Sequence, residues 1–480
     1  LIRDAAYESI PKELRAELHE RFAGWLGDVA GERLEEQEEI LAYHLEQAYR
    51  YREELGPVDE RTRGLGRRAA RHLAATAHRA SARGDVAATA NLFSRAVGLL
   101  PAGDPERLSL LPEVGHALAE AGRYEEARRL LTEAIEAAGA TGDALMGARA
   151  RVADVLVRVF ADPEGTGAEA EEASSEVIPT FEAAGDHLWL SRAHRLRSTG
   201  PWMFARYAEM LVGVERAAEH ARLAGDRGEL RVAFGLLSVA LIFGPTPVDE
   251  AIPRLEEIGR EAFGLRSGSS PGSDIPLAML GRFDEARRAN EEWRALFEEL
   301  GRPQWLTDFA RGMVELITGD AREAERFLRR GRDELLRMGE KSVLSTLSAL
   351  LSRALCLQGR FDEALPFIEE SVELAPSEDA ASQMYWRTSK AMVQASRGDL
   401  GEAERLAREA VAIGRTTDAI NDLADALADL AGIVAARGRG GEAADLLREA
   451  VELFERKGNV VSAGRARERL AELGGGSAGP

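Results

Sequence analysis

A glycine-to-helix motif recurs along this 480-residue chain and constrains its fold more than any other feature. Its clearest copy, GRFDEALPFIEESVELAP, runs from Gly359 to Pro376. We expect Gly359 to end one helix, and the two carboxylates after it to suit the N-terminal end of the next helix dipole. Ala364 lets two helices approach closely, and Phe367 and Ile368 fill the contact between them. Pro376 then ends the second helix.

The spacing of the motif indicates a repeat architecture. Further copies begin at Gly84, Gly122, Gly281, Gly319, Gly398 and Gly438. The step from Gly84 to Gly122 and the steps from Gly281 onward are 38, 38, 40, 39 and 40 residues. A period in this range predicts a solenoid of stacked helix pairs. The 159 residues between Gly122 and Gly281 fit four periods, so we expect three weaker turns there, near residues 162–167, 204–207 and 244–248.

Composition and charge exclude several classes of function. The chain is 45% hydrophobic and carries a net charge of −20, which argues against general nucleic-acid binding and against binding to anionic membranes. The sequence contains no run of about 18 apolar residues, so it predicts no membrane span. The one cysteine, Cys356, excludes an internal disulfide and favours a cytoplasmic location, and we expect its thiol to be buried.

The sequence offers no recognisable catalytic chemistry. The nearest approach to a phosphate-binding loop is Gly339-Glu340-Lys341-Ser342, in which Glu340 separates the glycine from the lysine. His19 and His44 have no metal-ligand spacing, and all eight histidines fall in the first half of the chain. We expect packed, hydrogen-bonded histidines, with a pH-sensing cluster as the alternative. The sequence therefore predicts no catalytic residue, no metal site and no cofactor in this chain.

The repeats resemble the tetratricopeptide family. In the copy from Gly84, Phe93, Ala96 and Pro101 occupy its large, small and stop positions. The resemblance implies an all-α fold, a right-handed superhelical solenoid of about ten helix pairs with about 39 residues in each, against about 34 in the usual repeat. It also implies that the first helices of successive pairs line a concave groove that binds a protein or peptide, with a small effector as another occupant.

The first 60 residues do not follow the repeat and carry a second resemblance. The runs LIRDAAY from Leu1, Leu18-His19 after Arg15, and Tyr43-His44-Leu45 through Tyr49 resemble the segment that follows the ATPase module of bacterial STAND-type signalling proteins. The likeness is to the actinobacterial type with a class III adenylate/guanylate cyclase domain. It implies a longer parent with cyclase and ATPase domains before Leu1, and it places no catalytic residue in this chain.

Composition predicts how the chain is divided. We expect a linking helical segment over residues 1–60, then two halves of the solenoid over 61–263 and 277–473, and a disordered tail over 474–480. Between the halves, GLRSGSSPGSDIP at residues 264–276 is rich in glycine, serine and proline. It predicts a shortened helix and a loop, either a hinge or an insertion without function.

The groove candidates are aromatic, arginine and threonine side chains on the expected inward-facing helices. Aromatic residues and arginine dominate binding interfaces, although the same aromatics at helical spacing also suit a packed core. The candidates are Trp202, Tyr207, Trp305, Phe309, Arg353, Tyr385 and Thr388.

The sequence thus favours an interaction module over an enzyme. We expect a sensor or regulatory arm of a larger signalling ATPase, one that carries a nucleotide cyclase. The alternatives are the repeat region of an ATP-dependent transcriptional regulator and a free-standing scaffold protein.

Overall fold

The computed structural model describes residues 7–30, 34–264 and 272–475, and every regular element in these ranges is a helix. The chain divides into two compact units, Leu1–Asp154 and Val155–Pro480. The division falls inside α8, and the predicted boundaries at residues 60, 263 and 276 lie within the units. The first unit holds α2 (Lys12–Ala30), α3 (Leu34–Leu55), α4 (Glu60–Arg83), α5 (Val86–Gly98), α6 (Pro105–Glu120), α7 (Tyr124–Thr141) and the start of α8 (Ala144–Ala161).

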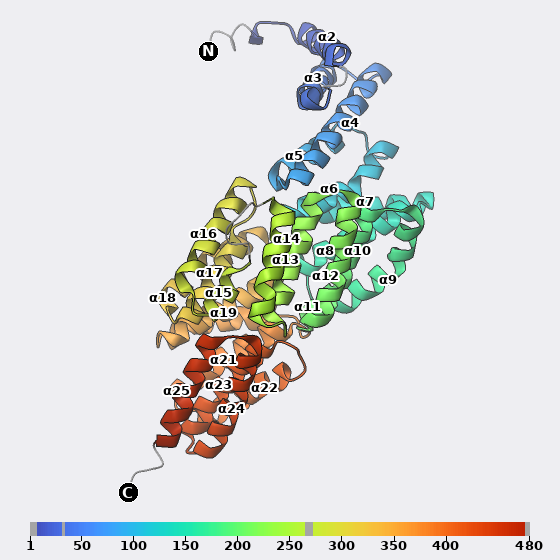
Figure 1. Cartoon of the computed structure of the whole chain (residues 1–480). Coiled ribbons are helices and arrows are strands. Elements are labelled where there is room, and N and C mark those ends of the chain that lie inside the picture. Colours follow the sequence, from blue (N-terminus) through green and yellow to red (C-terminus); the bar gives the residue numbers. More distant parts are fainter. Residues whose placement is uncertain (1–6, 31–33, 265–271, 476–480) are drawn as a thin grey trace. The chain divides into compact units, whose positions relative to one another are not determined.

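The second unit begins with the end of α8 and continues through seventeen further helices of the described chain (Figure 1). They are α9 (Thr166–Ala184), α10 (His187–Arg197), α11 (Thr199–Met203), α12 (Tyr207–Ala224), α13 (Arg227–Phe243), α14 (Val248–Phe263), α15 (Asp274–Met279), α16 (Phe283–Glu299), α17 (Trp305–Thr318), α18 (Ala321–Met338), α19 (Ser342–Leu357), α20 (Phe361–Leu374), α21 (Ala380–Ser396), α22 (Leu400–Gly414), α23 (Ile420–Ala436), α24 (Gly440–Lys457) and α25 (Val460–Gly475).

Capping residues at the helix ends explain why the helices follow one another at regular spacing. The repeat glycines end their helices in the left-handed region, as Gly359 does with φ 74°, where a side chain would be strained. Where an aspartate follows the glycine, it caps the next helix: the carboxylate of Asp85 accepts a hydrogen bond from the Ala88 amide at 2.9 Å. The predicted motif is thus a C-cap followed directly by an N-cap.

From α4 to α24 the described helices follow one another as ten pairs, and the pairs within each unit pack on their neighbours, which confirms the predicted all-α helical-repeat fold. Ala364 and Ile368 are 0% and 1% exposed, as the motif predicts, whereas Phe367 is only half-buried against the core. The three weaker turns also lie where the period places them, because α9, α12 and α14 begin at Thr166, Tyr207 and Val248. The helix at the start of the α15–α16 pair is short, as predicted, while residues 265–271 and 476–480 lie outside the described residues.

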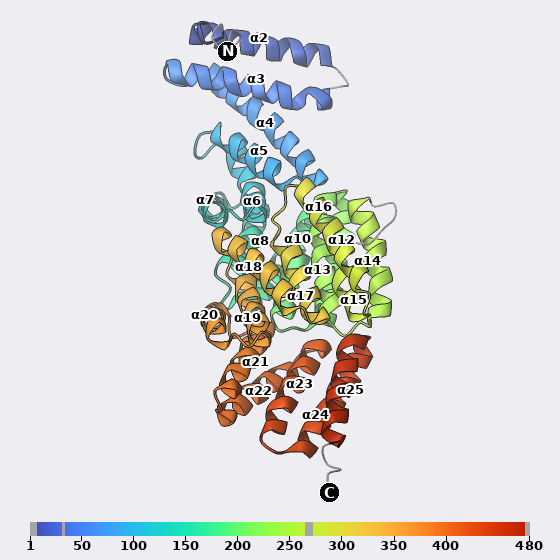
Figure 2. The same ribbon diagram turned by 90° about the vertical axis from the view of Figure 1, so that its left-hand side faces the viewer.

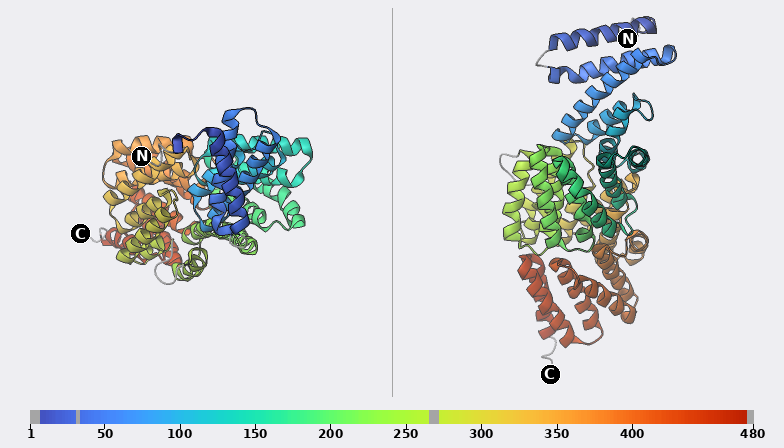
Figure 3. Two further views of the ribbon diagram at one scale, coloured as in Figure 1. Left: turned by 90° about the horizontal axis from the view of Figure 1, so that it is seen from above. Right: turned by 90° about the vertical axis from the view of Figure 1, so that its right-hand side faces the viewer.

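In the first unit, α2 and α3 form an antiparallel pair ahead of α4 (Figures 2 and 3). Ala16, Ala23 and Leu26 of α2 pack towards α3 and are at most 7% exposed. Two histidines join this contact, with His19 Nδ1 2.7 Å from His44 Nδ1.

The second unit closes on itself, because helices about 210 residues apart in the chain meet end to end. The carboxylate of Asp418 accepts hydrogen bonds from the Tyr207 and Ala208 amides at 2.7 and 2.8 Å, which caps the N-terminus of α12. The Nζ of Lys457, which is 0% exposed, donates to the carbonyls of Leu241, Gly244 and Thr246.

Lys457 lies at the C-terminal end of α13, where a cation suits the helix dipole, and Asp418 suits the N-terminal end of α12. Glu378 makes a similar contact with the first turn of α9, accepting from the Gly167 amide at 2.9 Å. We call the contacts of Asp418, Lys457 and Glu378 the turn-to-turn contacts.

Candidate functional site

The first helices of the last three pairs, α19, α21 and α23, direct polar side chains to a common side. Arg353 of α19 pairs with Asp429 of α23, with 2.5 Å between Arg353 NH1 and Asp429 Oδ2. α21 lies between these two helices, so the ion pair crosses over it. Both side chains must therefore project to the same side. We call Arg353, Tyr385, Asp422, Asp425 and Asp429 the inner-face cluster.

Three aspartates on one face of α23 make this cluster acidic. Asp422, Asp425 and Asp429 follow one another at spacings of three and four residues, which brings them onto one side of the helix. The Tyr385 hydroxyl donates a hydrogen bond to Asp422. The second carboxylate oxygen of Asp422, Oδ2, is buried and has no hydrogen-bond partner among the described residues.

The inner-face aspartates are held in a poorly solvated position. Asp422 is 5% exposed, and burial followed by the nearby charge of Asp425 raises its pKa to about 7. Burial likewise raises the pKa of Asp425 to about 6, although Arg353 acts in the opposite direction. The attraction of Asp429 raises the pKa of Arg353, so this arginine stays charged. Lys457 acts on Asp422 and Arg465 on Asp425 in the same direction as Arg353, but burial outweighs these cations.

The structure brings only part of the predicted groove set together. Arg353 and Tyr385 lie in the inner-face cluster, whereas Trp202, Trp305 and Phe309 are half-buried against the core of the second unit. Tyr207 and Thr388 were predicted to line the groove, but each is only 4% exposed and is therefore not accessible to a ligand. The ring of Tyr207 packs in the core of the second unit, with its centroid 6.1 Å from that of Phe243, and the Thr388 hydroxyl donates to the Tyr385 carbonyl at 3.0 Å.

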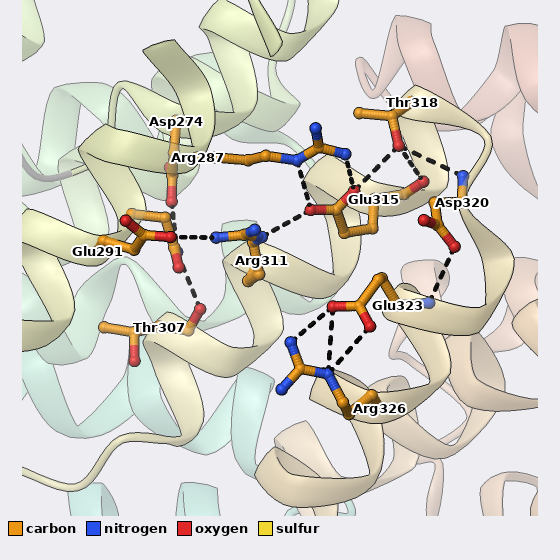
Figure 4. Close-up of polar contacts among 11 residues, drawn as sticks. Asp274, Arg287, Glu291, Thr307, Arg311, Glu315, Thr318, Asp320, Glu323 and Arg326 are labelled. Carbon is orange, nitrogen blue, oxygen red and sulfur yellow. Dashed lines mark hydrogen bonds and ion pairs between the residues drawn. The ribbon is translucent and has the colours of Figure 1, made fainter. Parts of the chain in front are cut away.

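A second polar cluster surrounds Glu315 of α17 and is saturated with partners (Figure 4). Arg287 donates to both carboxylate oxygens of Glu315, at 2.9 and 2.7 Å, and Arg311 Nε donates at 2.7 Å. Burial alone would raise the pKa of Glu315, but these hydrogen bonds outweigh it and the net shift is downward. Close by, Asn290 bridges Asp274 and the Thr307 carbonyl. This cluster fastens short α15 to α16 and α17, and we assign it to structure.

The segment that resembles a phosphate-binding loop is the start of α19. The Glu340 carboxylate accepts hydrogen bonds from the Val343 and Leu344 amides at 2.9 and 3.0 Å, while the Lys341 amide donates to the Phe160 carbonyl. Burial raises the pKa of Glu340 to about 8. A side chain of the protein thus takes the place at the helix N-terminus where an anion would bind.

The histidines form groups that the sequence did not reveal. His187 and His220 lie 3.2 Å apart through their Nδ1 atoms, and His194 stacks on His220. Burial, reinforced by His220, lowers the pKa of His194 to about 4, and burial with His44 does the same for His19. These two histidines are therefore neutral near pH 7, as expected for packed side chains. Their meeting depends on how neighbouring helices are aligned, which no local motif reports.

The first unit has a pocket of about 330 Å³ between α3 and α5. Its cations are already paired: Arg50 and Arg95 both bind Glu46, and Arg123 binds Glu126. Its other lining residues are Tyr49, Glu53, Asn91, Ser94, Gly98 and Leu99. Because these guanidinium groups already have carboxylate partners, this pocket is a weaker candidate than the inner-face cluster.

Neither a metal-binding group nor a membrane-spanning helix occurs among the described residues. No group of three or more His, Cys, Asp or Glu side chains there is placed to hold a metal ion. Within the same ranges, no helix has the length and apolarity needed to cross a bilayer. Cys356 is buried as predicted, and burial raises the pKa of its thiol to about 12.

Sequence reasoning missed the aspartates of the inner-face cluster, although a signal for them exists. The run INDLADALADLAG from Ile420 places three aspartates on one helical face, beside a stripe of leucine and alanine. A row of aspartates on the first helix of a pair is expected to face the inner side of the solenoid. The predicted groove residues were aromatic, arginine and threonine side chains, so these aspartates were not among them.

Comparisons with known proteins agree with the repeat architecture. Residues 423–457 match the tetratricopeptide repeat family. No curated protein sequence is similar to the chain. Among solved structures, a Rap protein complexed with competence and sporulation factor has 14% identity and a TM-score of 0.42, and the alignment covers 77% of this chain and 97% of that one.

Two further structures are similar over most of the chain. Yeast Tom70 has 11% identity and a TM-score of 0.30, with 96% of this chain and 97% of that chain covered. Cut9–Hcn1 of the APC/C has 12% identity and a TM-score of 0.37, with 96% and 98% covered. The helix pairs and the match at residues 423–457 together identify a tetratricopeptide-like helical-repeat region, an architecture of protein-interaction scaffolds.

Proposed function

We propose that this chain is a non-enzymatic interaction module that binds a protein or peptide segment on the inner face of its second unit. The observation that carries the proposal is Asp425, a partly exposed carboxylate of α23 that lies between two further aspartates, Asp422 and Asp429, on the same helix face. Buried carboxylates are costly unless they are paired. A lysine or arginine of the ligand would pair with the carboxylate of Asp425.

The ligand class follows from the shape of the cluster. Tyr385 offers an aromatic ring beside the carboxylates, and the Arg353–Asp429 pair closes one side of the cluster. An aromatic ring beside an acidic group suits a basic side chain, through a charged hydrogen bond and contact with the ring face. We therefore expect a peptide with a basic residue at one fixed position.

A peptide library with each of the twenty residues varied at each position tests this proposal. We expect the purified chain to select lysine or arginine at one position, and the double variant D422N/D425N to lose that selection. D445N is the matched control, because Asp445 lies on α24 with its side chain 76% exposed. A library without a basic preference, or a preference that D422N/D425N retains, would contradict the proposal.

We also propose that the module is the regulatory arm of a larger signalling ATPase that carries a nucleotide cyclase. The support is the resemblance of the first 60 residues to the segment that follows the ATPase in STAND-type proteins. Determining the reading frame before Leu1 tests this part alone. A P-loop and a cyclase domain there would agree with it. A nearby start codon would instead indicate a free-standing scaffold. The proposal that the chain binds a basic peptide would be unaffected by that result.

A further inference from the structure

The helix α2 lies at the outer end of the first unit (Figure 2), and it carries a stripe of exposed apolar side chains. The stripe consists of Leu14, Leu18, Phe22, Trp25 and Val29, which are 44%, 46%, 39%, 55% and 58% exposed. Their spacing of three and four residues puts them on one side of the helix. The opposite side of α2 is already buried against α3. A helix that is apolar on both sides normally has partners on both sides.

Two residues of α3 extend the stripe into a patch. Ile40 and Tyr43 are 45% and 46% exposed. The ring of Phe22 links the two helices, because its centroid lies 5.5 Å from that of Trp25 and 4.3 Å from that of His44. We call these seven exposed side chains, five on α2 and two on α3, the outer patch. None of its members carries a charge.

The outer patch is large for a surface that faces only water. Its three aromatic side chains have about 150–250 Å² each and its four aliphatic ones somewhat less, and with roughly half of that surface exposed the patch offers about 600 Å². Isolated exposed leucines are normal, but a contiguous patch of this size marks an interaction site. Two such patches in contact would bury about 1,200 Å², which reaches the range of stable protein interfaces.

We propose that two copies of this chain dimerise through the outer patch, with their α2 helices antiparallel across a twofold axis. A twofold interface requires a patch that is complementary to itself. The stripe meets this condition, because its spacing reads nearly the same in both directions. Antiparallel pairing sets Leu14 opposite Val29 of the second copy and Leu18 opposite Trp25, with Phe22 close to the axis. A partner of another sequence would not need this symmetry.

The charge of the chain predicts how the dimer responds to salt. Each copy carries a net charge of −20, so two copies repel each other at long range, whereas the outer patch itself is uncharged. Salt screens the repulsion and leaves the apolar contact in place. We therefore expect the dimer to tighten as salt is raised, the opposite of an interface held by ion pairs.

Sedimentation equilibrium of the purified 480-residue chain tests the proposal, over about 1–100 µM protein at low and high salt. We expect a species of twice the 52.1 kDa chain mass. The variant L18E/W25E should raise the dissociation constant by about 30-fold or more, the size expected for a hot spot at the centre of an interface. Because both side chains are exposed, these glutamates do not threaten the fold, which circular dichroism verifies.

The matched control is L336E, because Leu336 on α18 is 52% exposed and lies in the other unit. This variant should dimerise as the unmodified chain does. A second measurement uses F22C, which should form a disulfide between copies on mild oxidation, since the natural Cys356 is buried. L336C should form none. A monomer at every concentration and salt, or a dimer that L18E/W25E leaves intact, would overturn the proposal.

Discussion

Asp422 shows what a single residue contributes to this protein. Its carboxyl is buried, and its pKa is raised to about 7, chiefly by burial. In an unfolded chain the same group has a pKa near 3.8. The folded state therefore holds this proton more tightly, and the stability gained is present below about pH 4 and lost as the pH rises through 7.

The substitution D422N should remove this pH dependence, because an amide resembles the protonated carboxyl and does not ionise. Between about pH 5 and pH 8 the unmodified chain should lose roughly 1–4 kcal/mol more of unfolding free energy than D422N. Chemical denaturation at the two pH values measures the difference. D445N, at an exposed position, should keep the slope of the unmodified chain, and an equal slope in D422N would contradict the buried, proton-holding role of Asp422.

At the scale of one helix, two glycines with similar positions should respond oppositely to alanine. Gly312 lies inside α17, where an added Cβ would come within 2.6 Å of Leu328, a residue that is 0% exposed. Gly235 lies inside α13, where a Cβ meets nothing within 4 Å. Close helix packing therefore requires glycine at the first position and not at the second.

We expect G312A to destabilise the protein by about 1–3 kcal/mol, since the core must shift to admit the methyl group. G235A should stabilise it by up to about 1 kcal/mol, because alanine is the better helix former. Thermal unfolding of both variants and the unmodified chain measures the direction of each change in stability. A stable G312A would mean that α17 and α18 do not pack as closely as described.

At the scale of the second unit, the turn-to-turn contacts join helices that an open solenoid would leave apart. In an open solenoid each repeat stabilises only its neighbours. Here Lys457 and Asp418 hold the facing ends of α13 and α12, and each removes backbone groups from water. The stability of α12 and α13 should therefore depend on residues more than 200 positions later in the chain.

The variant D418N/K457M tests this dependence by hydrogen exchange. Losing one cap and three buried hydrogen bonds should speed amide exchange in α12 and α13 by about 10-fold or more. Exchange in α4 and α5 of the first unit should not change, which serves as the internal control. Unaltered protection of α12 and α13 would show that these contacts add nothing to their stability.

The same difference in scale explains how much the sequence could predict. The positions of helix ends are local: Gly359 needs a left-handed backbone and Asp85 caps the next amides, so a motif of a few residues predicts them. The pairing of helices follows from the period. The fold class and even the weak turns at α9, α12 and α14 could therefore be read from the chain.

The candidate site was harder to predict because it depends on contacts between distant repeats. Arg353 was predicted to face inward, but its partner Asp429 lies 76 positions away on a helix that does not follow directly. Tyr207 was predicted to line the groove and is buried, near carboxylates that lie 172 to 215 positions later in the chain, those of Asp379, Asp418 and Asp422. Neither fact has a local signature, since both depend on the curvature that the stacked pairs accumulate.

The closure of the second unit also limits how this protein can evolve. Open repeat arrays lengthen and shorten freely, because a duplicated or deleted repeat disturbs only two junctions. In this chain, removing any one pair from α15–α16 to α19–α20 would shift Asp418, Glu378 and Lys457 away from the helix ends that they contact. The number of repeats in this unit is thus fixed by its own closure, and natural variants should change repeat sequence and not repeat count.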